Sequence, residues 1–211
     1  QIGEGAGNLA FGPEQIEVGR HGVAIGQGGK RGVFLPEVAV ENGWNPNLTG
    51  QGEPERVNAG LVSGDWFDVY GVAPLLGRTL RPDEAVAGKN HVVVLSHGMW
   101  NRMFAGDRGV LGRAIQLNGE SYEIVGVMPA SFRDFFNRGA QLWSPILFRP
   151  DQFADGNRTN EYLSFTARLK PGVTADAAAG EMHAYAARLR HDFKDNYAPD
   201  WDLLLRPLAE Q

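Results

Sequence analysis

The feature that most constrains the fold of this 211-residue chain is an Asn-Gly pair between two strand-like runs. Asn118 and Gly119 separate residues 114–117 from residues 120–125. A two-residue type I′ turn needs a positive φ at both central positions, and Asn followed by Gly supplies it most readily. The sequence therefore predicts an antiparallel hairpin here, and Pro129 predicts the end of its second strand.

A buried strand and a capped helix are expected before this hairpin. Residues 92–95 are a continuous apolar run of strand length. Ser96 follows directly and can cap a helix, because a serine side chain accepts a hydrogen bond from an N–H group of the first turn. The apolar residues at helical spacing after this cap are Met99, Trp100, Met103 and Phe104.

Three further strands and a long helix are expected toward the end of the chain. Residues 142–146 and 203–208 are short apolar runs, and residues 162–169 alternate as a strand does. Thr174 can cap a helix that reaches about residue 190. The apolar stripe of this helix consists of Met182, Tyr185, Ala186, Leu189 and Phe193.

The beginning of the chain is rich in glycine. Residues 1–12 are small and aperiodic, so we expect a loose leader. Residues 16–25 and 33–35 flank a Gly-rich turn, which indicates a hairpin. Pro36 can then open a helix that ends at Gly43.

A second short helix is expected at residues 64–70. Ser63 can cap it and Gly71 can end it. Its inward residues would be Trp66, Phe67 and Tyr70. Strands and helices thus occur without regular βαβ alternation, which is typical of the α+β class, with mixed or antiparallel sheets and a few helices.

Composition excludes several functions. The net charge is −5 and basic residues are scattered, so the basic patch of a nucleic-acid-binding protein is absent. The chain has no cysteine, which excludes disulfides, Cys-ligated zinc and thiol catalysis. No run approaches the ~18 apolar residues of a membrane span. The chain starts at Gln1 without a signal peptide, so it reads as a piece of a longer protein.

From residue 47 onward, motifs in a fixed order resemble the MacB-like periplasmic core domain of ABC transporter permeases. The first is Asn47-Leu-Thr-Gly-Gln-Gly-Glu-Pro-Glu-Arg-Val57. The others are Val62-Ser-Gly-Asp-Trp-Phe-Asp-Val-Tyr-Gly-Val72, Leu76-Gly-Arg-Thr79, Val93-Val-Leu-Ser96 with Trp100, Val110-Leu-Gly-Arg113, Leu117-Asn-Gly119, Ile124-Val-Gly-Val-Met-Pro129 and Ala167-Arg-Leu-Lys-Pro-Gly-Val173.

This resemblance implies a porter-like fold with a smaller inserted subdomain. It also implies a non-catalytic extracytoplasmic domain on the periplasmic face of the bacterial inner membrane, anchored by flanking transmembrane helices outside this sequence. Its partners would be those helices, a separate cytoplasmic ATPase subunit or domain, and a periplasmic protein. The domain would couple ATP hydrolysis to export or to partner interaction.

Residues 1–46 depart from this pattern, so we expect a domain boundary between 46 and 47. Residues 13–22 and 31–44 resemble a fragment of the AmmeMemoRadiSam system protein A family. The alternative function is therefore an accessory or enzyme protein of that family. It predicts polar groups that converge near Arg20, His21, Lys30 and Arg31. A third hypothesis is a scaffold or receptor domain of the same fold.

No catalytic, cofactor or metal site is expected. The Gly26–Gly32 loop lacks the phosphate-binding spacing, since Ala24 and Arg31 replace the required Gly and hydroxyl residue. Ser96 and His97 are neighbours at a helix start and do not face each other. Asp65 and Asp68 suit a helix N-terminus for dipole reasons. None of the five histidines has zinc-ligand spacing; they are His21, His91, His97, His183 and His191.

One group of aromatic residues is a candidate contact surface. Phe132, Phe135 and Phe136 follow Pro129 in an expected loop and are not periodic. Exposed aromatic residues of this kind mark protein interfaces. The sequence therefore predicts a partner contact at these three residues.

Overall fold

The computed structural model describes residues 24–25, 39–50, 53–135, 139–147, 163–169 and 171–206, and its strands form one mixed sheet. The strands are β1 (Ala24–Ile25), β2 (Ala39–Trp44), β3 (Asn47–Thr49), β4 (Glu55–Arg56), β5 (Ala59–Val62), β6 (Leu76–Gly77), β7 (Val92–Leu95), β8 (Ala114–Leu117), β9 (Glu120–Val127), β10 (Leu142–Pro145), β11 (Leu163–Thr166) and β12 (Leu205–Arg206). The helices are α1 (Trp66–Tyr70), α2 (His97–Phe104) and α3 (Ala175–Asp192), with 3₁₀ turns η2 (Pro82–Glu84) and η3 (Arg108–Val110).

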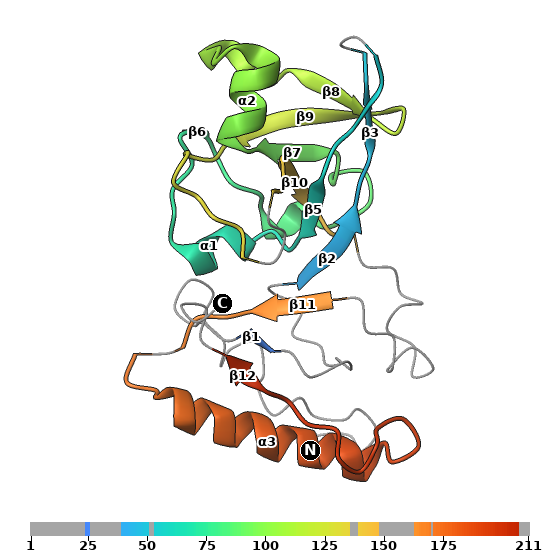
Figure 1. The fold of residues 1–211 in the computed structure, drawn as a ribbon, viewed down its shortest axis with the longest axis vertical. Coiled ribbons are helices and arrows are strands. Elements are labelled where there is room, and N and C mark those ends of the chain that lie inside the picture. Colours follow the sequence, from blue (N-terminus) through green and yellow to red (C-terminus); the bar gives the residue numbers. More distant parts are fainter. Residues whose placement is uncertain are drawn as a thin grey trace.

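The strand order is β12-β1-β11-β2-β5-β10-β7-β9-β8-β3-β4, with β6 beside β9. The pairs β5–β10 and β7–β9 are parallel, and the other pairs in the described residues are antiparallel. A mixed sheet with few helices confirms the predicted α+β class. In Figure 1, β7, β8, β9 and α2 lie at one end of the molecule, and β1, β11, β12 and α3 lie at the other.

The sheet is covered on both faces between β5 and β9. On one face, Val93 and Leu95 pack with Met99, Trp100 and Phe104 of α2. On the other face, Val94 and Trp143 pack with Trp66, Phe67 and Val69 of α1. Successive strand residues point to opposite faces, so a strand buried on both sides reads as the continuous apolar run of residues 92–95.

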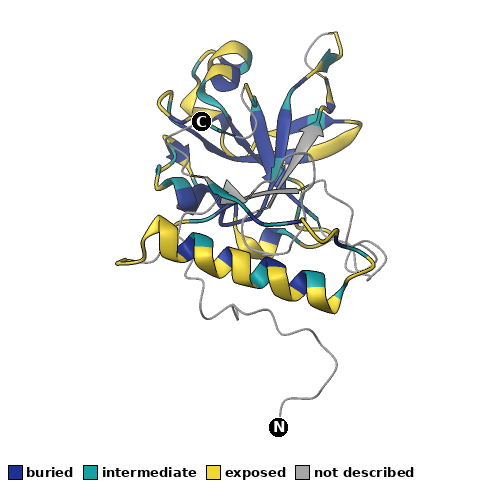
Figure 2. Ribbon diagram, turned by 60° about the horizontal axis from the view of Figure 1, so that its bottom comes forward, coloured by how far each residue is buried: buried dark blue, intermediate teal, exposed yellow. Residues whose placement is uncertain are grey.

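Helix α3 covers the other end of the molecule. Met182, Ala186 and Leu189 face inward and pack on Tyr197, Trp201 and Leu203, which follow the helix. Figure 2 shows this inward stripe as buried and the outer face of the helix as exposed. The observed stripe confirms the predicted one, and Thr174 caps the helix by accepting a hydrogen bond from the Ala177 N–H at 3.2 Å.

The predicted Asn-Gly hairpin is confirmed. β8 and β9 pair from Ala114–Glu123 to Leu117–Glu120. Asn118 and Gly119 have φ values of 53° and 84°. The Asn118 side chain also accepts a hydrogen bond from the Asn47 N–H at 2.9 Å, so the turn fastens β3 to the hairpin. The strand at 92–95 and the Ser96 cap of α2 are confirmed as well.

Two local predictions are wrong. Residues 39–43 are not in a helix opened by Pro36; they belong to β2, which pairs with β5 on one side and β11 on the other. A helix there would leave the facing backbone groups of β5 and β11 without partners.

Ser63 is also not the cap of α1, because the helix begins at Trp66 with Asp65 as its N-cap residue. Gly64 lies against another backbone segment, since a Cβ there would be 2.1 Å from the Arg81 carbonyl carbon. The predicted end at Gly71 is confirmed by its φ of 65°.

Most of the Gly-rich beginning lies outside the described residues, including the expected leader at 1–12 and the turn at 26–32. The expected strands at 162–169 and 203–208 are described in part, as β11 and β12. Of the first 46 residues, Ala24–Ile25 pairs with β11 and β12, and β2 pairs with β5. The described strands of residues 1–46 therefore belong to the same sheet as the strands after residue 46.

The turn glycine gives a direct test of the hairpin. Gly119→Ala should lower the free energy of unfolding by about 1 kcal/mol, because a non-glycine residue at positive φ is strained. Gly180→Ala is the matched control: it lies in α3 with open space around it, and it should raise stability by up to about 1 kcal/mol through helix propensity. Urea denaturation of both variants measures the difference, and equal effects would contradict the assigned turn.

Candidate functional site

The loop that follows β9 is anchored by Phe132. This residue is 8% exposed and belongs to the core on the α1 face of the sheet. Its ring centroid lies 5.3 Å from those of Tyr70 and Trp143, 5.6 Å from that of Phe67 and 5.9 Å from that of Trp66. These are the separations of interacting aromatic pairs, so Phe132 fixes the loop to both α1 and β10.

The expected exposure of Phe132 is therefore wrong. The residue is drawn into the core because the loop turns back toward the sheet after Pro129, where the Phe132 N–H donates to the Pro129 carbonyl at 3.0 Å. Phe135 is half-buried and stacks on Tyr70 at 6.0 Å with an interplanar angle of 6°. Phe136 lies outside the described residues. A partner contact at Phe135 and Phe136 stays a prediction.

A pocket of about 410 Å³ opens beside this loop. It lies where the parallel strands β7 and β9 end, between the start of α2 and residues 128–134. Its walls are formed by Ser96, His97, Gly98, Met128, Pro129, Ala130, Phe132, Arg133, Asp134, Gly139, Ala140 and Trp143. Ligands of sheet proteins often bind at the carboxyl ends of adjacent parallel strands, so this is the main candidate site in the described part of the chain.

Three charged or titratable side chains line the pocket. Arg133 folds over its own loop, donating through Nη1 to the carbonyls of Ala130 at 2.7 Å and Phe132 at 3.0 Å. Asp134 accepts a hydrogen bond from Trp143 Nε1 at 2.9 Å. His97 Nδ1 lies 3.0 Å from the amide nitrogen of Asn101, one turn along α2.

Burial and charge also affect a tyrosine next to the pocket loop. Burial raises the pKa of the Tyr70 phenol, and the nearby Asp134 carboxylate raises that pKa further. Both effects favour the protonated, neutral form of the Tyr70 side chain. Ser96 caps α2 through its Oγ, which accepts from the Met99 N–H at 3.2 Å, as the sequence predicted.

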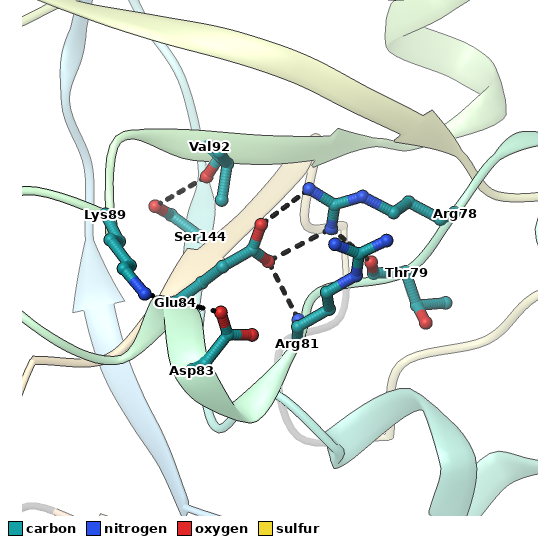
Figure 3. A network of polar contacts seen from close by, with 8 residues as sticks. All are labelled: Arg78, Thr79, Arg81, Asp83, Glu84, Lys89, Val92 and Ser144. Carbon is teal, nitrogen blue, oxygen red and sulfur yellow. Dashed lines mark hydrogen bonds and ion pairs between the residues drawn. The ribbon is translucent and has the colours of Figure 1, made fainter.

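The other polar cluster of note is structural. Residues 78–84, which we call the strap, run from β6 to η2. Glu84 accepts two hydrogen bonds from the Arg78 guanidinium, at 2.5 and 3.1 Å, and one from the Arg81 N–H at 2.8 Å (Figure 3). Glu84 is only 7% exposed, whereas the side chain of its partner Arg78 is 33% exposed, so the pair lies at the edge of the core.

Two glycines let the strap lie directly on the fold. A Cβ at Gly126 would come 1.9 Å from the Arg78 carbonyl oxygen, and one at Gly64 would come 2.1 Å from the Arg81 carbonyl carbon. Sequence reasoning missed this cluster. Its signal was the Arg81-Pro-Asp-Glu84 sequence, which has the acidic residue three positions after the cap and proline at the first helical position.

The remaining candidate residues that the structure describes do not form a metal-binding cluster. Among the described residues, no three His, Asp or Glu side chains come together to hold a metal ion. His183 contacts Asp202 at 2.7 Å and His91 contacts Glu120 at 3.5 Å, as separate surface pairs. Partial burial raises the pKa of the Asp68 carboxyl. Arg20, His21, Lys30 and Arg31 lie outside the described residues.

No helix in the described ranges combines the length and the apolar character needed to cross a membrane. The fold is that of an α+β domain with one mixed sheet and a pocket where the parallel strands β7 and β9 end. A family model described as the MacB-like periplasmic core domain matches residues 10–185. The chain belongs to this family, as the motifs from residue 47 onward indicated. It is therefore a periplasmic domain of an ABC transporter permease.

Individual relatives agree with this family. The macrolide export ATP-binding/permease protein MacB of Salmonella paratyphi A is 28% identical over 151 residues, which are 71% of this chain and 22% of that protein. The chain thus spans less than a quarter of the length of this relative. The matched family range includes residues 13–46, so the AmmeMemoRadiSam alternative is not favoured.

Two solved structures share the fold. The periplasmic region of MacB from Actinobacillus actinomycetemcomitans has a TM-score of 0.61 at 17% identity, covering 92% of this chain and 91% of that structure. The extracellular domain of the noncanonic ABC-type transporter YknZ from Gram-positive bacteria has a TM-score of 0.54 at 17% identity, covering 85% and 84%. These likenesses confirm the fold predicted from the sequence.

The aromatic anchor can be tested by truncation. Phe132→Ala should lower the free energy of unfolding by about 3–5 kcal/mol, because it leaves a cavity among four aromatic rings. Phe135→Ala should cost less, since that side chain is half-buried. Thermal or urea denaturation compares the two variants, and an equal or smaller loss for Phe132→Ala would rule out its anchoring role.

The strap network can be tested by removing one charge. Glu84→Gln should lower the free energy of unfolding by about 2–3 kcal/mol, because it leaves Arg78 beside a neutral partner in a partly dry site. Glu55→Gln is the matched control: it breaks the exposed 2.6 Å pair with Arg102 and should cost about 1 kcal/mol or less. Urea denaturation gives both values, and a loss no larger for Glu84→Gln would show that the network does not hold the strap.

Proposed function

We propose that this domain is non-catalytic and couples ATP hydrolysis by a cytoplasmic ATPase subunit or domain to export or to contact with a periplasmic partner protein. The observation that carries the proposal is the family match over residues 10–185. The relatives from Salmonella are named as macrolide export ATP-binding/permease proteins. Their name supports the proposal that ATP hydrolysis belongs to a separate ATP-binding part and that this domain belongs to the permease part. The transported substrate is not part of the proposal.

The site supports a role without chemistry of its own. The titratable residues at the pocket are Arg133, Asp134 and His97, and each has a partner that positions it in the loop or helix. Ser96, the hydroxyl residue that lines the pocket, serves as the cap of α2, since its Oγ accepts from the Met99 N–H. These features suit a binding module better than an enzyme.

The proposed location is the periplasmic face of the inner membrane, with flanking transmembrane helices as anchors and partners. Residues 47–211 would form the core domain, preceded by the Gly-rich head at 1–46. Phe135, at the rim of the loop after β9, would contribute to a partner contact. The exposed outer face of α3 gives this module a second broad surface (Figure 2).

The location can be tested with single cysteines, because the chain contains none. In the membrane-inserted parent protein, Ser121→Cys places a thiol on an exposed position of β9. It should react with a membrane-impermeant maleimide on spheroplasts, whose periplasmic face is open to the reagent. Ser144→Cys is the matched control, since Ser144 is 1% exposed and should react only after denaturation. Labelling of Ser121→Cys only after membrane disruption would refute the proposed side.

The coupling role needs a second experiment on the assembled transporter. Replacement of this domain by a short flexible linker should leave basal ATP hydrolysis measurable while export falls to background. The isolated chain should hydrolyse no ATP. ATP turnover by the isolated chain, or full export without the domain, would overturn the proposal.

A further inference from the structure

The two ends of the molecule are in contact through Arg168. One is the α3 end, with β1, β11, β12 and α3, and the other is the β7 end, with β7, β8, β9 and α2 (Figure 1). Arg168 Nη2 donates a hydrogen bond to the carbonyl of Val69 in the last turn of α1. We propose that this contact is a latch. While it is closed the two ends keep one relative orientation, and when it opens they turn relative to each other about β2. The inference concerns the isolated chain, so it fails or holds independently of the transport proposal.

Strand β2 is a suitable hinge between the two ends. In the strand order, both β11 and β5 are bonded to β2, so this strand joins the α3 end to the rest of the described sheet. Its pairing with β5 changes register between Glu41 and Trp44. A β-bulge at such a shift bends the strand and interrupts the ladder of hydrogen bonds. The sheet is therefore least regular at the strand that connects its two ends.

Arg168 moves with the α3 end. It lies in the segment of residues 167–174, which leads from β11 directly into α3. Its acceptor is at the end of a helix, because α1 stops at Gly71, whose φ is 65°. The last carbonyls of a helix lack partners within the helix, and arginine side chains can satisfy them. Gly71 also leaves room for the guanidinium, since a Cβ there would come 3.4 Å from Arg168 Nη2.

Helix α1 moves with the β7 end. Its buried residues Trp66, Phe67 and Val69 share a core cluster with residues of β7, β9 and β10. The last turn of α1 also contacts the loop after β9, because Tyr70 stacks on Phe135 at 6.0 Å. The latch and the partner contact predicted at Phe135 therefore meet at one turn of α1.

The contact is weak enough to open while both ends stay folded. Arg168 is an exposed residue, so water competes for its hydrogen bond. A hydrogen bond of this kind, from a charged donor, shifts an equilibrium by about tenfold. Each end has its own buried core cluster, which does not include Arg168. Loss of the latch should consequently change the orientation of the ends without unfolding them.

A distance between two spin labels tests the latch. The chain has no cysteine, so Ser121→Cys on β9 and Ala184→Cys on α3 provide two exposed labelling sites, one on each end. Pulsed electron paramagnetic resonance of the labelled 211-residue chain should give one main distance. Arg168→Met keeps an unbranched stem and removes every donor, so it should raise the ratio of displaced to latched molecules by about tenfold. A distance distribution that Arg168→Met leaves unchanged would overturn the proposal.

Two further variants separate the latch from a general loss of charge. Arg188→Met removes an exposed cation of α3 that lies over the Tyr185 ring of its own helix, 5.7 Å from the ring centroid. This variant should leave the distribution unchanged. Arg168→Lys retains a charged donor and should give a distribution between those of the parent and Arg168→Met. The same broadening in Arg188→Met, or no recovery in Arg168→Lys, contradicts the latch.

A label pair within one end distinguishes the latch from a purely structural role. Ser121→Cys on β9 and Asn101→Cys on α2 are exposed positions that both belong to the β7 end. Their distance should be the same with Arg168 and with Arg168→Met. If Arg168→Met also changes this distance, or does not fold, Arg168 supports the fold of the β7 end itself and the proposal fails.

Discussion

The arrangement of this domain depends on β5, a four-residue strand paired on both edges. It pairs with β2 in antiparallel and with β10 in parallel orientation. Backbone groups buried in a sheet must find partners, so this double pairing joins the two ends of the molecule through hydrogen bonds. The end with β7, β8 and β9 carries the pocket and the strap, and the end with β11 and β12 carries α3 (Figure 1). Without β5 these would be two separate sheets.

Elements governed by local chemistry could be predicted from the sequence. The Asn118-Gly119 turn, the Ser96 and Thr174 caps and the Gly71 terminus each depend on one residue's conformational preference or side-chain oxygen, and each is present. The helix from Pro36 to Gly43 was predicted on the same basis and is wrong. Backbone pairing of β2 with β5 and β11 stabilises the strand more than the weak helix preference of residues 36–43 stabilises a helix. The two partner strands lie elsewhere in the sequence, so residues 36–43 alone do not reveal this pairing.

The candidate site was predictable only in part. The aromatic loop after Pro129 was identified, but Phe132 was predicted to be exposed and is buried. Its burial depends on contacts with α1 and β10, which the sequence of the loop does not reveal. The pocket could not be read from the sequence, since its walls come from three segments that meet only at the ends of β7 and β9. The Arg78–Glu84 pair likewise depends on how closely the strap approaches Gly64 and Gly126.

The pairing of β1 has a consequence for the order of assembly during synthesis. Ala24 and Ile25 lie between β11 and β12, strands made from residues 163–166 and 205–206. Closing such sequence-distant contacts costs loop entropy and slows folding. On the ribosome, the end of the molecule with β7, β8 and β9 can fold as soon as β10 emerges, whereas the α3 end must wait until almost the whole chain has been made. Strand β1, which is made before every other strand in the described residues, is therefore among the last of them to be paired.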